Sequence, residues 1–162
     1  MLEKTGVPDL EKLKEKFPPM ARIDRGPVAV IECYEKIPCN PCETACKAHA
    51  IEIGEDINSV PLLSPDACTG CAVCLSRCPG LAIMVVDGSK SKSYLEFRIP
   101  YEFLPLPKEG DTVWGLNRAG QKLSRVRVVR VQNPKAFDRT PVITLEVPRE
   151  ELYTFRSIQT ED

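Results

Sequence analysis

The apolar positions of this chain fall in short runs, and their spacing predicts small secondary-structure elements separated by frequent turns. Near the N-terminus, Leu10, Leu13 and Phe17 lie on one face of a helix. Asp9 can cap that helix, and Pro18-Pro19 ends it. A helix of this length is marginal alone, so we expect it to pack on its own domain or to dock on a partner subunit.

Short β-type runs dominate the C-terminal part of the chain, after a polar linker at residues 88–93. One run breaks its alternation at Val128-Val129, which predicts a β-bulge. Roughly five short strands in about 65 residues are typical of a small antiparallel barrel or sandwich, which leans on a neighbouring domain or a partner for stability. The candidate strands are residues 94–99, 111–116, 123–131, 142–147 and 152–158.

The middle of the chain contains two similar units. In the first, Ala50-Ile51 begins four residues after Cys46, and in the second Ala82-Ile83 begins four residues after Cys78. Each unit continues as a short strand, and a further strand at residues 28–31 leads into the first unit. A duplicated unit predicts two equivalent sites related by pseudo-symmetry.

The composition restricts the class of protein. The chain has 162 residues, a formal net charge of −1 and eight cysteines, all between residues 33 and 78. No apolar run approaches the roughly 18 residues of a membrane span, and the first residues lack the apolar core of a secretory signal. We therefore expect a cytoplasmic protein, in which clustered cysteines are metal ligands rather than disulfides.

The second group of cysteines has the spacing of one particular kind of metal site. Three cysteines separated by two residues each can wrap one side of an iron–sulfur cubane, whereas a fourth, three residues further on, points away and reaches a second cubane. Gly70 permits the tight turn between the first two, and Pro79 directs the chain outward. The run consists of Cys68, Cys71, Cys74 and Cys78.

The first group of cysteines departs from this spacing in two ways. Its first gap has five residues instead of two, and Lys47 follows the last cysteine where the second group has a proline. The later part of the group fits, so we expect Cys33 to be a remote first ligand. The group consists of Cys33, Cys39, Cys42 and Cys46.

Crossed ligation of two clusters follows from these runs, and residues 28–87 resemble the bacterial-type ferredoxin domain with two [4Fe-4S] clusters. Structural zinc and disulfides are the alternatives, and zinc sites more often use paired C-x2-C knuckles. One cubane with a three-iron cluster, or with Cys33 as a non-ligand, also stays open. The two expected ligand sets are Cys33, Cys39, Cys42 and Cys78 for cluster 1, and Cys68, Cys71, Cys74 and Cys46 for cluster 2.

Three residues near the first group have a structural and a functional interpretation. His49, the single histidine, is either solvent-facing or otherwise satisfied, or has a redox or proton role beside a cluster. Tyr34 and Ile37 lie in the five-residue gap. They either pack that loop, or shield the first cluster or meet a partner.

No motif for substrate chemistry is visible: the sequence has no phosphate-binding glycine loop, nucleophile–base pair or dinucleotide fingerprint. Arg125, Arg127 and Arg130 form either a solvated strand face or a docking patch for an acidic partner or a nucleic acid. We therefore expect a non-catalytic α+β protein, with a ferredoxin-like domain followed by a small β-barrel or sandwich. The expected parts are an N-terminal helix and extension (1–27), the two-cluster domain (28–87), the linker (88–93) and an all-β domain (94–162).

Residues 25–42 are similar to the small iron–sulfur subunits of FAD-dependent amino-acid or amine dehydrogenases, such as dye-linked proline dehydrogenases and sarcosine-oxidase-like complexes. The resemblance implies a hetero-oligomer whose partner chains carry FAD, sometimes FMN. It also implies that this chain relays single electrons between flavins or to an external acceptor. A free-standing ferredoxin that serves several oxidoreductases is an alternative. So is a structural or regulatory iron–sulfur protein whose β-domain binds a nucleic acid or another protein.

Cluster binding would make one part of the chain strongly negative, although the amino acids alone give a net charge near zero. Residues 33–87 have three basic and seven acidic side chains, which gives −4. Two oxidised cubanes with their thiolates bring this to about −8. Residues 88–162 have thirteen basic and ten acidic side chains, which gives +3. We therefore expect an acidic redox domain joined to a mildly basic one.

Overall fold

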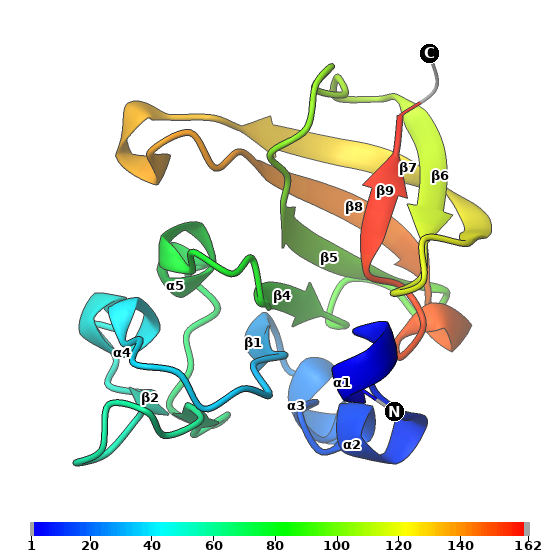
Figure 1. Ribbon diagram of the computed structural model, residues 1–162. Helices are drawn as coiled ribbons and strands as arrows, with labels where there is room; N and C mark the ends of the chain where they lie inside the picture. The colour runs from blue at the N-terminus through cyan, green and yellow to red at the C-terminus, as the bar shows by residue number, and fades with distance from the viewer. Residues whose placement is uncertain (1, 161–162) are drawn as a thin grey trace.

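A seven-stranded antiparallel sheet organises the computed structural model, which describes residues 2–160 (Figure 1). Its strand order is β1-β4-β5-β8-β7-β6-β9, and β2 and β3 form a separate antiparallel pair. The helices are short, and among the described residues none is long and apolar enough to cross a membrane. The elements are α1 (Leu2–Thr5), α2 (Leu10–Lys14), α3 (Met20–Ile23), β1 (Val28–Ile31), α4 (Pro41–Ala45), β2 (Ile51–Glu52), β3 (Leu62–Leu63), α5 (Val73–Arg77), β4 (Ile83–Asp87), β5 (Tyr94–Pro100), β6 (Thr112–Leu116), β7 (Lys122–Gln132), η1 (Lys135–Phe137), β8 (Val142–Pro148), η2 (Arg149–Glu151) and β9 (Ser157–Gln159).

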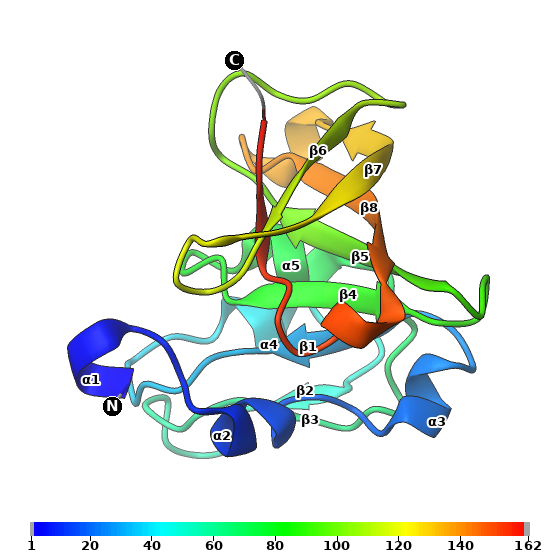
Figure 2. The ribbon, with the colours of Figure 1, turned by 90° about the vertical axis from the view of Figure 1, so that its right-hand side faces the viewer.

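The sheet runs without interruption from the cysteine-rich region into the C-terminal strands. β4 pairs with β1 along one edge and with β5 along the other, so these strands lie stacked in Figure 2. Residues 88–93, expected to be a linker, form the turn between β4 and β5. Arg149 donates to the carbonyl oxygens of Gly88 and Ser91, the latter at 2.7 Å. Pairing with β5 covers an edge of β4 that would otherwise be open, so the C-terminal strands continue the sheet that β1 and β4 begin.

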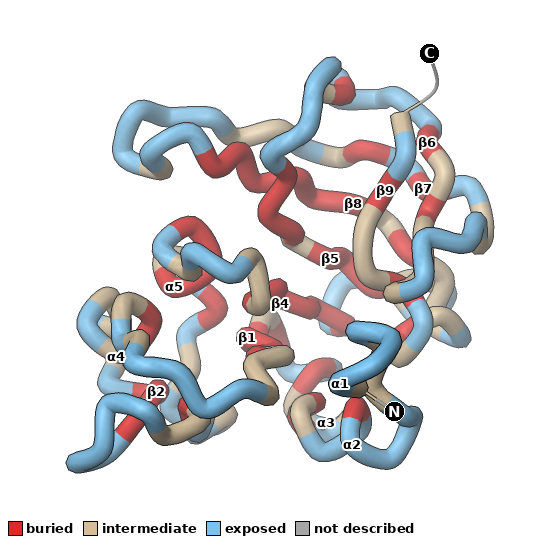
Figure 3. Tube along the Cα trace, viewed as in Figure 1, coloured by how far each residue is buried: buried red, intermediate tan, exposed pale blue. Residues whose placement is uncertain are grey.

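The two faces of the sheet bury different cores because side chains alternate along each strand. In β1, Val28 and Val30 belong to the main core, whereas Ala29 and Ile31 belong to a second core that includes cysteines. Strand β4 is buried along its whole length, since both of its faces are covered. Figure 3 shows this burial along β1, β4, β5 and β8, and exposure at the outer end of the β7–β8 hairpin.

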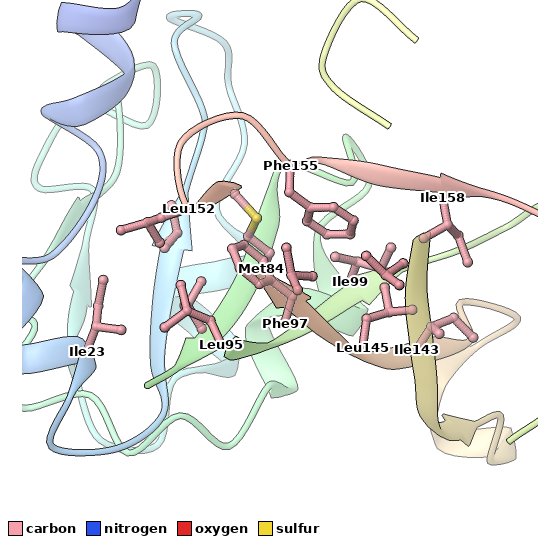
Figure 4. Close-up of a cluster of buried hydrophobic side chains, with 14 of the residues drawn as sticks. Ile23, Met84, Leu95, Phe97, Ile99, Ile143, Leu145, Leu152, Phe155 and Ile158 are labelled. Carbon is pink, nitrogen blue, oxygen red and sulfur yellow. The ribbon is translucent and has the colours of Figure 1, made fainter. Parts of the chain in front are cut away.

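The main core is closed by the C-terminal segment. Phe155 packs edge-on against Phe97 of β5, with ring centroids 5.0 Å apart (Figure 4). The sequence predicted one strand over residues 152–158, but the chain there forms a turn directly after η2, and only the three-residue β9 is a strand. The turn lets both Leu152 and Phe155, three residues apart, reach the same core, which a strand with alternating faces would not.

The N-terminal helix packs on its own chain. The Asp9 carboxylate accepts a hydrogen bond from the Lys12 backbone N–H at 2.9 Å, which confirms Asp9 as the cap of α2. Leu13 and Phe17 are both buried in the main core, although α2 ends at Lys14. Phe17 also packs edge-on against Tyr153, at 5.1 Å between ring centroids.

The β-bulge expected at Val128-Val129 is confirmed. The register of β7 against β8 shifts between Val128 and Arg130, so that Arg127 lies opposite Glu146 and Arg130 lies opposite Thr144. The extra residue keeps Arg130 on the same face of the sheet as Arg127, where strict alternation would have turned it to the other face.

A buried ion pair joins the end of β1 to the C-terminal strands. The Arg118 guanidinium donates to both carboxylate oxygens of Glu32, and these side chains are only 8% and 6% exposed. Arg118 also donates to the Tyr153 carbonyl oxygen at 2.8 Å, and Arg156 approaches Glu32 at 4.0 Å. Because Glu32 directly precedes Cys33, this pair anchors the start of the first cysteine group.

Loss of one partner from this pair should destabilise the protein. The substitution Arg118→Met leaves the Glu32 carboxylate buried with only the longer contact to Arg156, and we expect a loss of about 3 kcal/mol. For a chain of this size the midpoint of thermal unfolding should fall by roughly 6–12 °C, measured by circular dichroism on anaerobic protein. The control is Arg25→Gln, which breaks an exposed pair with Asp66 and should change the midpoint by less than about 2 °C. Equal midpoints for the two variants would contradict the role of the buried pair.

Candidate metal centres: two cysteine cavities

Four cysteines from both halves of the repeat line one cavity. Three of them come from the first group, and Cys78 comes from the second. Ile31 of β1 and Ile83 of β4 form part of the wall, and Ile37 lies at the exposed five-residue gap. The four cysteines are Cys33, Cys39, Cys42 and Cys78, which is the set expected for cluster 1.

A second cavity contains the other four cysteines. Here three come from the second group, and Cys46 comes from the first. Ala29 of β1 and Val85 of β4 complete an apolar wall on the same face of the sheet. The four cysteines are Cys46, Cys68, Cys71 and Cys74, the set expected for cluster 2. The structure thus brings each expected set together, and their ligation of iron stays a prediction.

The two units repeat in backbone geometry as well as in sequence. The N–H of Ala50 lies 3.3 Å from the Cys46 Sγ, and the N–H of Ala82 lies 3.4 Å from the Cys78 Sγ. The residue before the alanine is His49 in one unit and Leu81 in the other, and both have a φ of 50°. His49 is exposed, in agreement with its solvent-facing interpretation.

Backbone N–H groups also point at the first cysteine of the second group. The amides of Ala29 in β1 and of Gly70 in the cysteine loop each lie 3.4 Å from the Cys68 Sγ. Such donors stabilise negative charge on thiolate sulfur, and in iron–sulfur proteins they tune the potential of the cluster. The cavities therefore offer what anionic clusters require, namely thiol ligands with oriented amides around them.

Burial and mutual repulsion keep the most enclosed thiols protonated at neutral pH. The pKa of Cys42 is raised to about 11, mainly by burial, with smaller contributions from the nearby Cys78 and Cys39. Burial raises the pKa of Cys74 to about 12, with further contributions from Cys68, Cys71 and Cys46. Metal binding to such thiols displaces their protons.

The cysteines surround a volume rather than a point. Among the described residues, no group of three or more His, Cys, Asp or Glu side chains converges as the ligands of a single ion would. A single zinc ion holds its sulfur ligands at about 2.3 Å, whereas the four thiolates of a cubane bind four different iron atoms and stand further apart. Each cavity is lined by four cysteines, and four thiols are the donor set that a [4Fe-4S] cluster takes.

Three arginines, which the sequence analysis did not identify, hold the backbone of the cysteine loops. Arg22 donates to the Cys68 carbonyl oxygen at 2.7 Å, Arg98 of β5 donates to the Gly70 carbonyl oxygen at 2.9 Å, and Arg156 donates to that of Leu81. They lie in three separate parts of the chain, so no local pattern connects them with the cysteines.

Tyr34 lies beside the ion pair at Glu32. Its hydroxyl is buried and has no hydrogen-bond partner among the residues that the structure describes. Burial raises the pKa of Tyr34 to about 12, with a further contribution from the Glu32 carboxylate. The Lys16 ammonium lies 5.4 Å from the centre of the ring. Tyr34 therefore packs the loop, while Ile37 is 48% exposed at the edge of the first cavity.

The three arginines of β7 have different surroundings. Arg125 stacks on Trp114, with its guanidinium carbon 5.0 Å from the ring centre. Arg127 lies 3.7 Å from Glu146 in an exposed ion pair. Arg130 lines a cleft that also reaches Cys71. The row is therefore not one uniform patch.

Comparison with known proteins gives a distant and partial similarity. A stretch of 54 residues is 39% identical to the ferredoxin-type protein NapF of Haemophilus influenzae. That stretch is 32% of this chain and 31% of the NapF chain, so this chain matches less than a third of that protein's length. No protein-family model matches the chain, and no solved structure does. The similarity and the eight cysteines together indicate a ferredoxin-type iron–sulfur protein at this distant level.

Gly70 provides a test of the loop around the second cavity. Its φ is 66°, and a Cβ atom there would lie 2.4 Å from the Pro27 Cβ and 2.5 Å from the Pro27 carbonyl oxygen. Gly70→Ala should therefore displace the loop and lower the iron content of purified protein toward half. Gly80→Ala is the matched control, because a Cβ at Gly80 meets no atom within 4 Å. Full iron content in both variants would contradict the requirement for this close approach.

Cys33 needs a separate test because its spacing is irregular. Cys33→Ser should remove cluster 1 and leave about half of the iron and acid-labile sulfide, since the cavity loses one of its four thiols. Ser59→Ala changes another residue of the same cavity wall and should keep the full content. Unchanged iron in Cys33→Ser would instead show that Cys33 is not a ligand.

Proposed function

We propose that this chain holds two [4Fe-4S] clusters and relays single electrons as the iron–sulfur subunit of an FAD-dependent amino-acid or amine dehydrogenase complex. The observation that carries the proposal is the crossed arrangement of the cysteines. Cys46, the last cysteine of the first group, lies in the cavity with the first three cysteines of the second group. Cys78, the last cysteine of the second group, lies in the cavity with the first three cysteines of the first group. The partial similarity to a ferredoxin-type protein supports the same class of cofactor.

Two clusters in these cavities would lie on one face of the same two strands. Residues 29 and 85 face the second cavity, whereas residues 31 and 83 face the first. The pairs Ala29–Val85 and Ile31–Ile83 are directly opposite each other in the β1–β4 ladder. The cavities are therefore two residues apart along the ladder, a separation suited to transfer of one electron between them. A site that needs only structural metal would not require this arrangement.

The chain's own residues have defined tasks in such a relay. The clusters, when bound, supply the one-electron redox chemistry. The cysteine thiolates hold them, and the amides of Ala50, Ala82 and Gly70 donate to the sulfurs and so stabilise added negative charge. Arg22, Arg98 and Arg156 fix the loops, so that little rearrangement accompanies a change of redox state.

A flavoprotein partner is the part of this proposal that rests on resemblance. It is supported by the stretch at residues 25–42 and by the chain beyond the cysteine region, which adds strands but no substrate-binding motif. A free-standing ferredoxin and a regulatory iron–sulfur protein are the competing assignments, and the tests below separate them.

Metal analysis tests the cofactors. Protein purified without oxygen should contain about eight iron atoms and eight acid-labile sulfides per chain, and dithionite should bleach its visible absorption. Values near four of each would contradict the presence of two cubanes, and one zinc ion per cavity would overturn the proposal. A Cys46→Ser, Cys78→Ser variant, which changes one cysteine in each cavity, is the matched low-iron control.

Isolation of the native complex tests the partner. The chain, tagged and expressed in its own organism, should co-purify in fixed ratio with a chain that contains FAD, and an imino or secondary-amine substrate should reduce the visible bands of the complex. A monodisperse monomer that several unrelated oxidoreductases reduce equally well would assign the chain as a free ferredoxin instead.

A further inference from the structure

A polar cleft lies between the loop of the second cavity and the open part of the sheet. Its volume is about 240 Å³, and its walls include Cys71 and Ala72 on one side and β5, β7 and β8 on the other. In Figure 1 the outer part of the β7–β8 hairpin projects beyond the sheet on the side of α5. The cleft is the part of this sheet face that the cysteine units leave uncovered.

The floor of the cleft carries a cationic row. Arg98 of β5 and Arg130 of β7 both lie opposite Thr144 of β8 in the ladder, so two guanidinium groups stand on either side of one hydroxyl. Arg98 donates to the Gly70 carbonyl oxygen. The Arg130 side chain has no hydrogen bond or ion pair among the described residues, and the bulge is what turns it to this face.

A third cation completes the cleft. Lys90, from the turn between β4 and β5, lies 2.6 Å from the Glu96 carboxylate, whose side chain is 8% exposed. The one acidic side chain of the lining is therefore neutralised, and Arg98 and Arg130 leave a net positive charge. The cations belong to residues 88–162, which carry a net positive charge, and they face the loop of the acidic residues 33–87. A cationic cleft favours an anionic group of a partner.

Cys71 gives the cleft access to the second cavity. Of the eight cysteines it is the exposed one, whereas the others are buried or partly buried. Electron transfer slows steeply with distance, so the sulfur nearest to solvent is the favoured point of entry. The cationic row and the exposed sulfur lie in the same cleft, which combines a docking charge with a short electron path.

We propose that this cleft is the electron-exchange port of the second cluster, and that an acidic segment of a protein redox partner docks in it. The proposal rests on the proposed electron-transfer function. Arg98 and Arg130 stand on two different strands and leave two positive charges in the cleft, which more than one carboxylate of an acidic segment can neutralise. In the exchange the partner loses one electron and this chain gains one, or the reverse, and no bond forms or breaks.

Small redox complexes of opposite charge test the port. The reduced protein is oxidised in a stopped-flow instrument by ferricyanide, an anion, and by hexaammineruthenium(III), a cation. Arg130→Gln should slow the reaction with ferricyanide by about threefold or more at low ionic strength, and the difference should vanish at high salt. The reaction with the cation should not slow. The matched control is Arg127→Gln, which removes the same charge from the same strand outside the cleft and should have a smaller effect.

Binding of charged peptides tests the kind of partner without any electron transfer. Hexaglutamate should bind the cluster-loaded protein in calorimetry and should slow its oxidation by ferricyanide, whereas hexalysine should do neither. Arg130→Gln should weaken hexaglutamate binding by about threefold or more, and Arg127→Gln should weaken it less. Binding of FMN or inorganic phosphate at the cleft, with no binding of hexaglutamate, would contradict the docking of an acidic protein segment. It would show that the cleft binds a small anion instead.

Iron and sulfide contents separate the failure of this proposal from that of the proposed function. The wild-type protein can contain both clusters while Arg130→Gln and Arg127→Gln behave alike toward both oxidants and the peptide. In that case the cleft is not the electron-exchange port, and the proposed electron-transfer function is unaffected. If the wild-type protein contains no iron–sulfur cluster, the proposed function fails, and the port fails with it.

Discussion

Strand β4 is the constraint on which the rest of this structure depends. Its five residues are all buried, with β1 on one edge, β5 on the other, and a different core on each face. Met84 and Val86 face the main core, whereas Ile83 and Val85 line the cysteine cavities. The cavities and the C-terminal strands therefore both pack against β4, and a displacement of β4 would disturb both.

Charged side chains connect the C-terminal half of the chain to the cysteine loops. Arg98 and Arg156, from the C-terminal half of the chain, donate to loop carbonyl oxygens, and Arg118 pairs with Glu32 directly before Cys33. The desolvation of both charges offsets much of their attraction in such a pair, but removal of one partner alone leaves an unpaired buried charge and is strongly destabilising. The C-terminal strands thus act as a scaffold that fixes the cysteine loops, in addition to any contact with a partner chain.

Several local features could be predicted because neighbouring residues encode them. Asp9 caps α2, the repeated Ala-Ile pairs follow the last cysteine of each group at equal offsets, and the broken alternation at Val128-Val129 is a bulge. The spacing of the cysteines also predicted two sets of four, and each set lines one cavity. The strand predicted over residues 152–158 differs, because burial of Phe155 against Phe97 outweighs local β-propensity.

The sequence alone determined the cysteine sets and the short elements around them, because thiol spacing, capping and alternation act over a few residues. Tertiary structure decided what lies far apart in the chain. It joined the C-terminal strands to β4, brought Arg22, Arg98 and Arg156 to the loops, and placed Arg130 in one cleft with Cys71. Those contacts depend on strand pairing and register between distant segments, and no periodicity within one segment encodes them.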